Sequence, residues 1–297
     1  MTLVQYPFKG ILVIALLSRT LLLFAEELYD QHQKVGCVYP FLTPIANFIE
    51  PIATHSDLSG VDEVDCIYVI NLDRRTDRWQ RMEQILNQNL LHANRVSGFD
   101  GRYRLTESDM DAIVGPYGRR NIKKGQVGIV ITYLSILKHA LDNNFNCIWV
   151  MEDDVEFHCS PESISKFLVA LSNLDPDWDL FYTNINHRYE NNSHISDCHW
   201  IRQDQRPDDP TILPDPEYFP SLQLARTWFH LGTSSSIFSK KGVKKIFDFL
   251  THIYFWSGLD IDIHHLPNIH EYISTIDLVG NWPFSDSDTW PKDDIGR

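Results

Sequence analysis

Short apolar segments that end in polar residues, each followed by a stretch with helical spacing, are the feature that most restricts how this chain folds. Residues 66–72 (CIYVINL) and 147–155 (CIWVMEDDV) are β-rich apolar runs of buried-strand length. Apolar residues recur at helical spacing in 73–91, where Asp73 or Thr76 is the expected cap. Further strands are expected at 93–101, 179–184 and 231–239, and further helices at 125–141, 161–174 and 240–250. The alternation predicts an α/β fold with a mostly parallel central sheet flanked by helices.

Polar residues collect where the predicted strands end. Asn71 and Arg74 close the first strand, Asp100 follows the second, and Glu152 to Asp154 end the strand that begins at Cys147. Ligands bind outside the carboxyl ends of the strands in such sheets. We therefore expect a binding site at this edge. Residues 203–220, rich in proline and acids, are predicted to be a long surface loop.

The first 25 residues are a separate segment without acidic residues, in which Lys9 precedes an apolar run that Arg19 interrupts. A cleaved signal peptide is the first interpretation, an uncleaved signal anchor the second and a buried amphipathic helix the third. The first two predict export or membrane association through the N-terminus, and a position at the cytoplasmic face stays open. Residues 26–60 are predicted to be a lead-in segment, and 61–297 a single domain.

Charge and cysteine content argue against three other classes of protein. The 40 acidic and 26 basic residues leave a formal net charge of −14, which argues against a nucleic-acid partner. The five cysteines are too few and too scattered for a disulfide scaffold, and the absence of a CxxC pair argues against a structural zinc site.

The acidic triplet Glu152, Asp153 and Asp154 is a candidate cation site. Adjacent carboxylates repel one another unless a positive charge lies among them, and Mg²⁺ or Mn²⁺ prefers oxygen ligands. A solvated acidic turn that caps the next helix is the alternative.

Arginines begin the helix after the first strand and form a candidate anion site. Arg74, Arg75 and Arg78 lie at or near its N-terminus, where phosphate groups are favoured. Surface ion pairs with neighbouring acids are the alternative. Because neither a P-loop nor a GxGxxG pattern is present here, a nucleotide-sugar diphosphate fits better than ATP.

These segments together resemble glycosyltransferase family 25. VINLDRRTDRWQRM, FDG at 99–101, GQVGIVITYLSILKHAL and WVMEDDV occur in the family's order and spacing, followed by GTSSSIFSKKGVKKIF, LDIDI at 259–263 and FSDSDT at 284–289. The family includes lipopolysaccharide-modifying galactosyl- and glucosyltransferases and collagen galactosyltransferases. The resemblance covers about residues 64–290. It implies a GT-A-like nucleotide-sugar-binding fold, a UDP-sugar donor and Mn²⁺ or Mg²⁺.

The resemblance also implies roles for single residues. Asn71, Arg74, Arg78, Asp100 and Thr132 would contact the donor. Asp154, with Asp153 or Glu152, would hold the metal. The implied reaction is inverting transfer of galactose or glucose to a saccharide or hydroxyl acceptor on a glycan, lipopolysaccharide or glycoprotein. It needs one base, for which we expect Asp260 and then Asp262, on the expectation that both face the site from an extended segment. His264 and His265 are possible further metal ligands.

The middle helix departs from the family pattern Gly-Glu-x-Gly-Cys-x-x-Ser-His. Gln126, Ile129, Thr132 and Tyr133 replace its Glu, Cys, Ser and His. A catalytically degenerate sugar- or nucleotide-binding relative is therefore one alternative. A metal-dependent phosphate-ester hydrolase is the second, although only His158 lies near Asp154 in sequence.

Overall fold

The computed structural model describes residues 38–53, 59–115, 118–185, 216–228, 230–283 and 288. The predicted signal or anchor segment (1–25) lies outside these residues, as does 203–215 of the predicted surface loop. Within the described ranges, no helix is both long enough and apolar enough to span a membrane.

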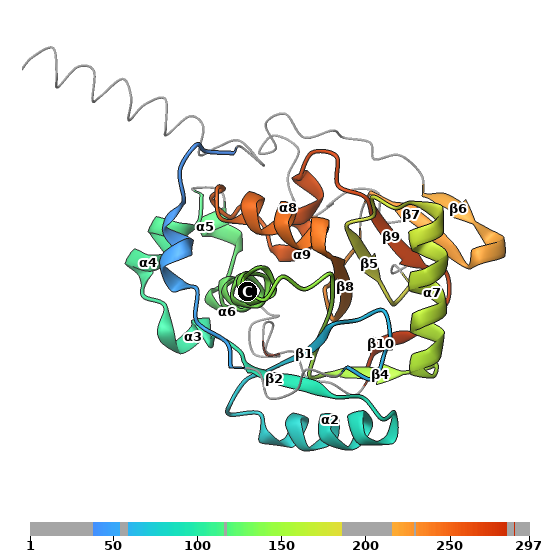
Figure 1. Cartoon of the computed structure of the whole chain (residues 1–297). Helices are drawn as coiled ribbons and strands as arrows, with labels where there is room; N and C mark the ends of the chain where they lie inside the picture. The colour runs from blue at the N-terminus through green and yellow to red at the C-terminus, as the bar shows by residue number, and fades with distance from the viewer. Residues whose placement is uncertain are drawn as a thin grey trace, which may run out of the picture.

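An eight-stranded sheet in the order β2-β1-β3-β8-β5-β9-β7-β6 forms the centre of the molecule (Figure 1). In this sheet, β7 and β8 run antiparallel to the other six strands. The predicted mostly parallel sheet is thus confirmed. Its strands are β1 (Cys66–Asn71), β2 (Ala93–Ser97), β3 (Cys147–Glu152), β5 (Leu180–Tyr182), β6 (Glu217–Phe219), β7 (Leu224–Thr227), β8 (Ser235–Ser239) and β9 (Glu271–Ser274).

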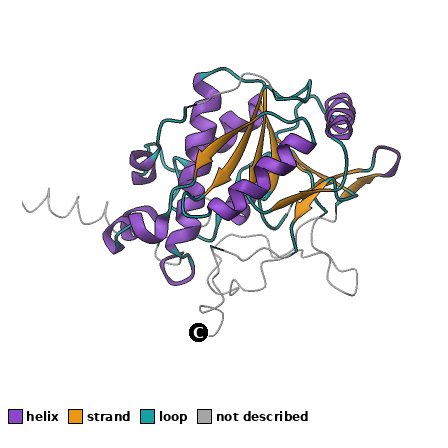
Figure 2. Cartoon of the chain, turned by 90° about the horizontal axis from the view of Figure 1, so that it is seen from below, coloured by secondary structure: helices purple, strands orange, loops and turns teal. Residues whose placement is uncertain are grey.

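Helices cover both faces of the sheet, which makes three layers (Figure 2). One core joins α6 (Lys124–Asp142) and α8 (Lys240–Leu250) to one face, and the other joins α2 (Thr76–Gln88) and α7 (Pro161–Leu174) to the opposite face. Side chains alternate between the two cores along a strand: Tyr68 points into the first and Val69 into the second. This two-sided burial explains why the strand sequences are apolar throughout.

Short elements complete the domain. A two-stranded antiparallel sheet pairs β4 (Val155–Phe157) with β10 (Val279–Asn281). The short helices are α3 (Gly101–Arg104), α4 (Glu107–Ile113), α5 (Gly118–Asn121) and α9 (Leu259–Asp262), and the 3-10 turns are η1 (Pro44–Phe48), η3 (Pro220–Leu222) and η4 (Ile263–His265). Within the predicted lead-in segment, η1 contacts α4 and buries Ile45 completely in the core that α6 and α8 share.

Two local predictions were wrong. The cap of α2 is Arg75, without a side-chain hydrogen bond, because Asp73 instead accepts hydrogen bonds from Arg95 and Ser97 across the sheet edge. The segment around Asp260 and Asp262 is the helix α9 and not an extended strand. Residues two apart on a helix point in different directions, so these two carboxylates do not share a face.

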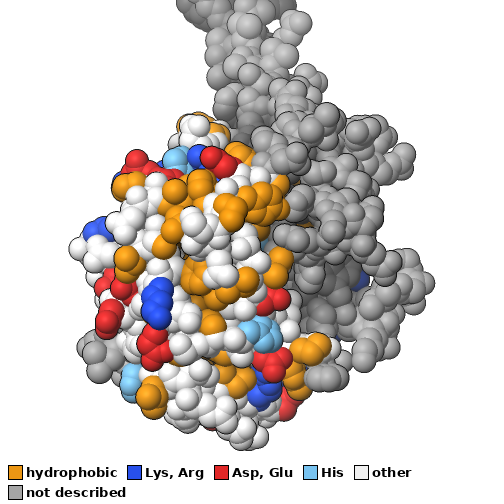
Figure 3. Space-filling model, turned by 90° about the vertical axis from the view of Figure 1, so that its right-hand side faces the viewer, with side chains coloured by type: hydrophobic (Ala, Val, Ile, Leu, Met, Phe, Trp, Pro, Cys, Tyr) orange, Lys and Arg blue, Asp and Glu red, His pale blue; other side chains and the backbone are white. Residues whose placement is uncertain are grey.

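Hydrophobic side chains form a band on the side of the molecule where α7 lies (Figure 3). Val169 on α7 and Tyr218 on β6 are 47% and 41% exposed. An open groove on this side is lined by Lys166, Val169, Ala170, Leu174 and Leu222, among others. It shares no residue with the pocket at the carboxyl ends of β1, β2 and β3.

Candidate active site

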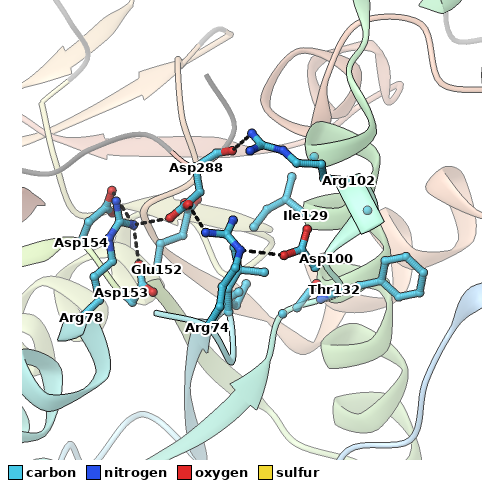
Figure 4. A pocket seen from close by; sticks show the side chains of 16 residues that line it. Arg74, Arg78, Asp100, Arg102, Ile129, Thr132, Glu152, Asp153, Asp154 and Asp288 are labelled. Carbon is cyan, nitrogen blue, oxygen red and sulfur yellow. Dashed lines mark hydrogen bonds and ion pairs between the residues drawn. The ribbon is translucent and has the colours of Figure 1, made fainter. Parts of the chain in front are cut away.

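A pocket opens at the carboxyl ends of β1, β2 and β3, the edge predicted from the sequence (Figure 4). Parallel pairing brings the ends of β1 and β3 side by side, with Ile70 opposite Glu152. Three arginines and five acids line the pocket, so its formal charge is negative by two. They are Arg74, Arg78, Arg102, Asp100, Glu152, Asp153, Asp154 and Asp288.

Asp153 is held on the buried side of the acidic triplet. Asn71 Nδ2 donates to its Oδ2 at 2.6 Å, and Arg78 Nη1 donates to its Oδ1 at 2.7 Å. Burial raises the pKa of the Asp153 carboxyl, although the bonds from Arg78 and Asn71 lower it. Arg95 in turn donates two hydrogen bonds to Asn71 Oδ1. Asp153 therefore ties α2 to the end of β3.

Glu152 and Asp154 are the partly exposed acids of the triplet and flank the buried Asp153. Thr233 Oγ1, just before β8, donates to Glu152 Oε1 at 3.2 Å. Burial and the like charges of Asp154 and Asp153 raise the pKa of the Glu152 carboxyl. Asp154 Oδ2 lies 3.7 Å from Arg78 Nη1. These two carboxylates are more exposed to the pocket than that of Asp153, whose two oxygens both accept hydrogen bonds from buried side chains.

An arginine cluster surrounds Asp288 at the pocket (Figure 4). Arg74 Nη1 and Arg75 Nη1 donate to its carboxylate at 2.7 and 2.5 Å, and Arg78 Nη1 lies 3.7 Å away. Arg102 Nη2 donates to the Asp288 carbonyl oxygen at 3.0 Å. Burial raises the pKa of the Asp288 carboxyl, but the Arg74 hydrogen bond and the charges of Arg75 and Arg74 outweigh it, so the pKa is lowered. The pocket thus already holds one anion of the chain itself.

The loop that carries Asp100 packs tightly on α6. Asp100 Oδ2 accepts from Arg74 Nε at 2.9 Å. A Cβ on Gly128 would lie 2.3 Å from the Phe99 carbonyl oxygen, and one on Gly101 would lie 1.9 Å from the Lys124 carbonyl oxygen. Only glycine allows this approach, which sets the depth of Asp100 in the pocket.

Thr132 and Tyr133, which replace the family's Ser-His pair, make internal contacts. Thr132 Oγ1 accepts from the Phe99 backbone N–H and donates to the Gly128 carbonyl oxygen, both at 2.9 Å. Thr132 lines the pocket, but its hydroxyl fastens the Asp100 loop. Tyr133 is buried and donates to the Thr233 carbonyl oxygen at 2.6 Å. It therefore supports the segment beside Glu152.

The two late acids have different surroundings. Asp260 is partly exposed, and its Oδ2 accepts from the Gly232 N–H at 2.9 Å. Burial raises the pKa of Asp260, and the charge of Asp260 contributes to the raised pKa of Glu152. Asp262 is 1% exposed, and its two oxygens accept from the N–H groups of Trp256 and Ser257, each at 3.1 Å. Of the two, Asp260 is the more exposed and interacts electrostatically with Glu152, although neither lines the pocket.

The histidines next to these acids hold elements together. His264 Nδ1 lies 2.7 Å from Glu271 Oε2, and the side chain of Glu271 is completely buried. His265 packs edge-on against Trp256. In the part of the chain that the structure describes, no group of three or more histidine, cysteine or acidic side chains is arranged to hold a metal ion.

Three residues in or beside the pocket were not predicted as site residues from the sequence. Arg102 carries no signal beyond its place after Asp100, and its role appears only in the folded chain. Asp288 lies in the FSDSDT motif, so its position in that motif was the available signal, whereas residues 284–287 and 289 lie outside the described residues. Arg95 lies within the strand β2 and contacts the site only through Asn71, so its sequence position gave no signal of this role.

The fold is that of an α/β protein with a charged pocket at the strand ends. A comparison with family models gives the family. Residues 64–263 match the model described as "Glycosyltransferase family 25 (LPS biosynthesis protein)". Because the match spans more than half of the 297 residues, this chain belongs to glycosyltransferase family 25.

Curated relatives share a part of their length with this chain. Procollagen galactosyltransferase 2 of Mus musculus is 28% identical over 152 residues, which cover 48% of this chain and 24% of that protein. Procollagen galactosyltransferase 1 of Danio rerio is 26% identical over 167 residues, or 53% and 27%. Inactive glycosyltransferase 25 family member 3 of Homo sapiens is 33% identical over 138 residues, or 41% and 22%. The chain thus spans about a quarter of the length of these relatives.

Proposed function

We propose that this protein transfers a hexose, galactose or glucose, from a UDP-sugar to a hydroxyl group of a glycan, lipopolysaccharide or glycoprotein acceptor, with inversion. The observation that carries the proposal is the convergence of Arg74, Arg75 and Arg78 on one carboxylate in the pocket. Guanidinium groups recognise phosphate as they recognise carboxylate, with paired N–H donors. A diphosphate that takes the place of the Asp288 carboxylate would find these donors already assembled.

The donor set at the pocket fits Mg²⁺ or Mn²⁺. The formal charge of its lining is negative by two, and Glu152 and Asp154 offer two carboxylates. Mg²⁺ in such sites uses one or two carboxylates and completes its shell with phosphate oxygens and water. Glu152 and Asp154 would hold the ion, with Asp153 as their anchor. The bound ion would supply Lewis-acid stabilisation of the leaving diphosphate.

Other residues would bind the donor and take the proton from the acceptor. Arg74 and Arg78 would stabilise negative charge on the phosphates, and Asp100 would orient Arg74 and bind the nucleoside. The Asp260 carboxylate would take the proton from the acceptor hydroxyl as that oxygen attacks the anomeric carbon. Asp262 is less suited to this role because both of its oxygens accept backbone hydrogen bonds.

The test is an assay of UDP release. The protein is incubated with UDP-galactose or UDP-glucose and Mn²⁺, with and without sugar or hydroxylysine acceptors. We expect acceptor-dependent release that a chelator abolishes and Mn²⁺ restores. Asp260→Asn should lower kcat by a factor of about 10² or more while UDP binding is kept. Asp154→Asn should abolish the activity that Mn²⁺ supports. Asp142→Asn, on the exposed side of α6, is the matched control and should keep that activity. No release from any donor by folded protein would refute transfer.

A donor-binding protein without transferase activity is the second candidate. The hydroxyls of Thr132 and Tyr133 are committed to backbone carbonyl groups, and one similar human protein is named inactive. If this second candidate is right, calorimetry should detect UDP binding, and the assay should detect no transfer to any acceptor. Restoring the family pair with the double substitution Thr132→Ser and Tyr133→His would then be expected to raise transfer.

A further inference from the structure

We propose that His264 and Glu271 form a buried positioning pair that sets the relative placement of Asp260 and Glu152. The inference rests on the proposed function, because it assigns these two carboxylates to the reaction. The pair lies behind the site, and neither residue lines the pocket.

The first link joins the pair to the segment before β8. The side chains of His264 and Glu271 are 5% and 0% exposed, and His264 Nδ1 lies 2.7 Å from Glu271 Oε2. The other ring nitrogen, Nε2, accepts from the His230 backbone N–H at 2.9 Å and lies 3.0 Å from the His230 carbonyl oxygen. Glu271 therefore fixes the orientation of the His264 ring, and His264 fixes the backbone of His230.

The second link continues through the His230 side chain. Its ring stacks on Tyr182, with centroids 4.0 Å apart and an interplanar angle of 10°. The Tyr182 hydroxyl donates to Glu271 Oε1 at 3.3 Å, so the stacking partner is attached to the same carboxylate. His230 Nδ1 lies 3.0 Å from the Gly232 carbonyl oxygen. These contacts hold the turn at Gly232, whose φ of +82° is a left-handed conformation that glycine adopts readily.

The third link ends at the two carboxylates. The Gly232 N–H donates to Asp260 Oδ2 at 2.9 Å, and the Thr233 hydroxyl donates to Glu152 Oε1 at 3.2 Å. Two adjacent residues of one segment thus contact the proposed base and a proposed metal ligand. A shift of residues 230–233 would displace both carboxylates together, and misplacement of a catalytic group by about 1 Å costs about 10²-fold in rate.

The experiment compares His264→Leu, which removes both contacts of the ring, with His264→Gln, which retains polar atoms to reach them. The matched control is His270→Leu, because His270 makes a similar 2.7 Å contact with Asp175 but has no hydrogen bond to residues 230–233. We expect His264→Leu to lower kcat at least tenfold with an unchanged KM for the UDP-sugar. His264→Gln should recover part of kcat, and His270→Leu should leave it unchanged.

A second measurement separates this inference from the proposed function. Amide hydrogen exchange at Gly232 and Thr233 should be faster in His264→Leu or His264→Gln than in the wild type, and unchanged in His270→Leu. If the wild type transfers no sugar but exchange responds in this way, the proposed function fails and the positioning link stands. Unchanged exchange at Gly232 in both folded His264 variants, or an equal loss of kcat in His270→Leu, would overturn the inference.

Discussion

At the scale of single residues, neighbouring acids in this chain have different roles because their surroundings differ. Asp153 accepts from Asn71 and Arg78 and is buried, whereas Glu152 and Asp154 on either side remain partly exposed. Asp262 is likewise buried, with both oxygens accepting from backbone N–H groups, whereas Asp260 is partly exposed and accepts from the Gly232 N–H through one oxygen. In the acidic triplet, Asp153 therefore makes structural hydrogen bonds, and the residues on either side of it are the candidate metal ligands.

Asp262 should make folding stability depend on pH. Burial raises the pKa of its carboxyl from 3.8 to about 7, against the backbone hydrogen bonds from Trp256 and Ser257. The folded state then binds a proton that the unfolded state has released, so this contribution is present below about pH 4 and is lost as pH rises towards 7. The expected slope is about 1 kcal/mol per pH unit in that window.

Urea unfolding of the wild type and Asp262→Asn between pH 4.5 and 8 measures this contribution. The free energy of unfolding of the wild type should fall more steeply with pH than that of the variant. Parallel curves would show that Asp262 is ionised in the folded protein throughout this range.

Asp288→Asn should tighten the binding of UDP. The wild-type carboxylate accepts from Arg74 and Arg75 and would compete with a phosphate of the proposed donor for the same N–H groups. Removing its charge should lower the Kd for UDP by a factor of about three to ten, equivalent to about 1 kcal/mol. Calorimetry checks this, with Asp77→Asn as the control, since Asp77 pairs with Arg75 but is 67% exposed. Weaker binding in Asp288→Asn would mean that the carboxylate orients the arginines.

At the scale of elements, the contact between α6 and the loop after β2 decides the shape of the pocket. Gly128 on α6 touches the backbone of Phe99 and Gly101, and Thr132, one turn later, accepts from the Phe99 N–H. Asp100 lies between these two contact points in the sequence. The packing of the loop on α6 therefore positions the Asp100 side chain for its hydrogen bond with Arg74.

Gly128→Ala should damage the site through this contact. The added Cβ would lie 2.3 Å from the Phe99 carbonyl oxygen and 2.8 Å from the Gly101 nitrogen, so the backbone must move. We expect a loss of about 1–3 kcal/mol in the free energy of unfolding and weaker UDP binding, because Asp100 moves with the loop. Lys138→Ala, on an exposed position of the same helix, should change stability by less than about 0.5 kcal/mol. Equal stability and UDP affinity in Gly128→Ala and the wild type would contradict the role of this contact.

At the scale of the whole molecule, the site joins segments from both ends of the described domain. Arg74 follows β1, and the Asp288 that it contacts is 214 residues away in sequence. Arginines from α2 and α3, acids from β3 and the late Asp288 meet in one pocket. A ligand that binds there should consequently stabilise the fold as a unit.

UDP with Mn²⁺ should raise the Tm, whereas UMP with Mn²⁺ should raise it less, because UMP lacks the second phosphate. A ligand at 100 times its Kd stabilises the folded state by about 2.7 kcal/mol, which corresponds to a Tm shift of several degrees for a domain of this size. Differential scanning fluorimetry measures the shift, and Arg74→Ala should reduce it. Equal shifts with UDP and UMP would argue against diphosphate recognition.

Much of the fold could be predicted from the sequence because it depends on local periodicity. The apolar runs at β1 and β3 and the helix Pro161–Leu174 were predicted with their observed positions to within a few residues. The clustering of Arg74, Asp100 and Glu152 to Asp154 followed from the rule that strand ends form the ligand edge. The α9 segment was predicted wrongly, because four residues with alternating acids are compatible with either period.

The sequence by itself determined the α/β architecture, the family and the edge of the sheet where polar residues gather, because hydrophobic period and strand polarity are properties of contiguous residues. Only the tertiary structure decided which hydrogen-bond partners the polar groups at that edge of the sheet have. It brought Asp288 to Arg74 and Arg75, used the hydroxyls of Thr132 and Tyr133 for backbone contacts, and connected His264 to Asp260 through Gly232. These outcomes depend on packing between residues far apart in the chain, and no local pattern encodes such distances.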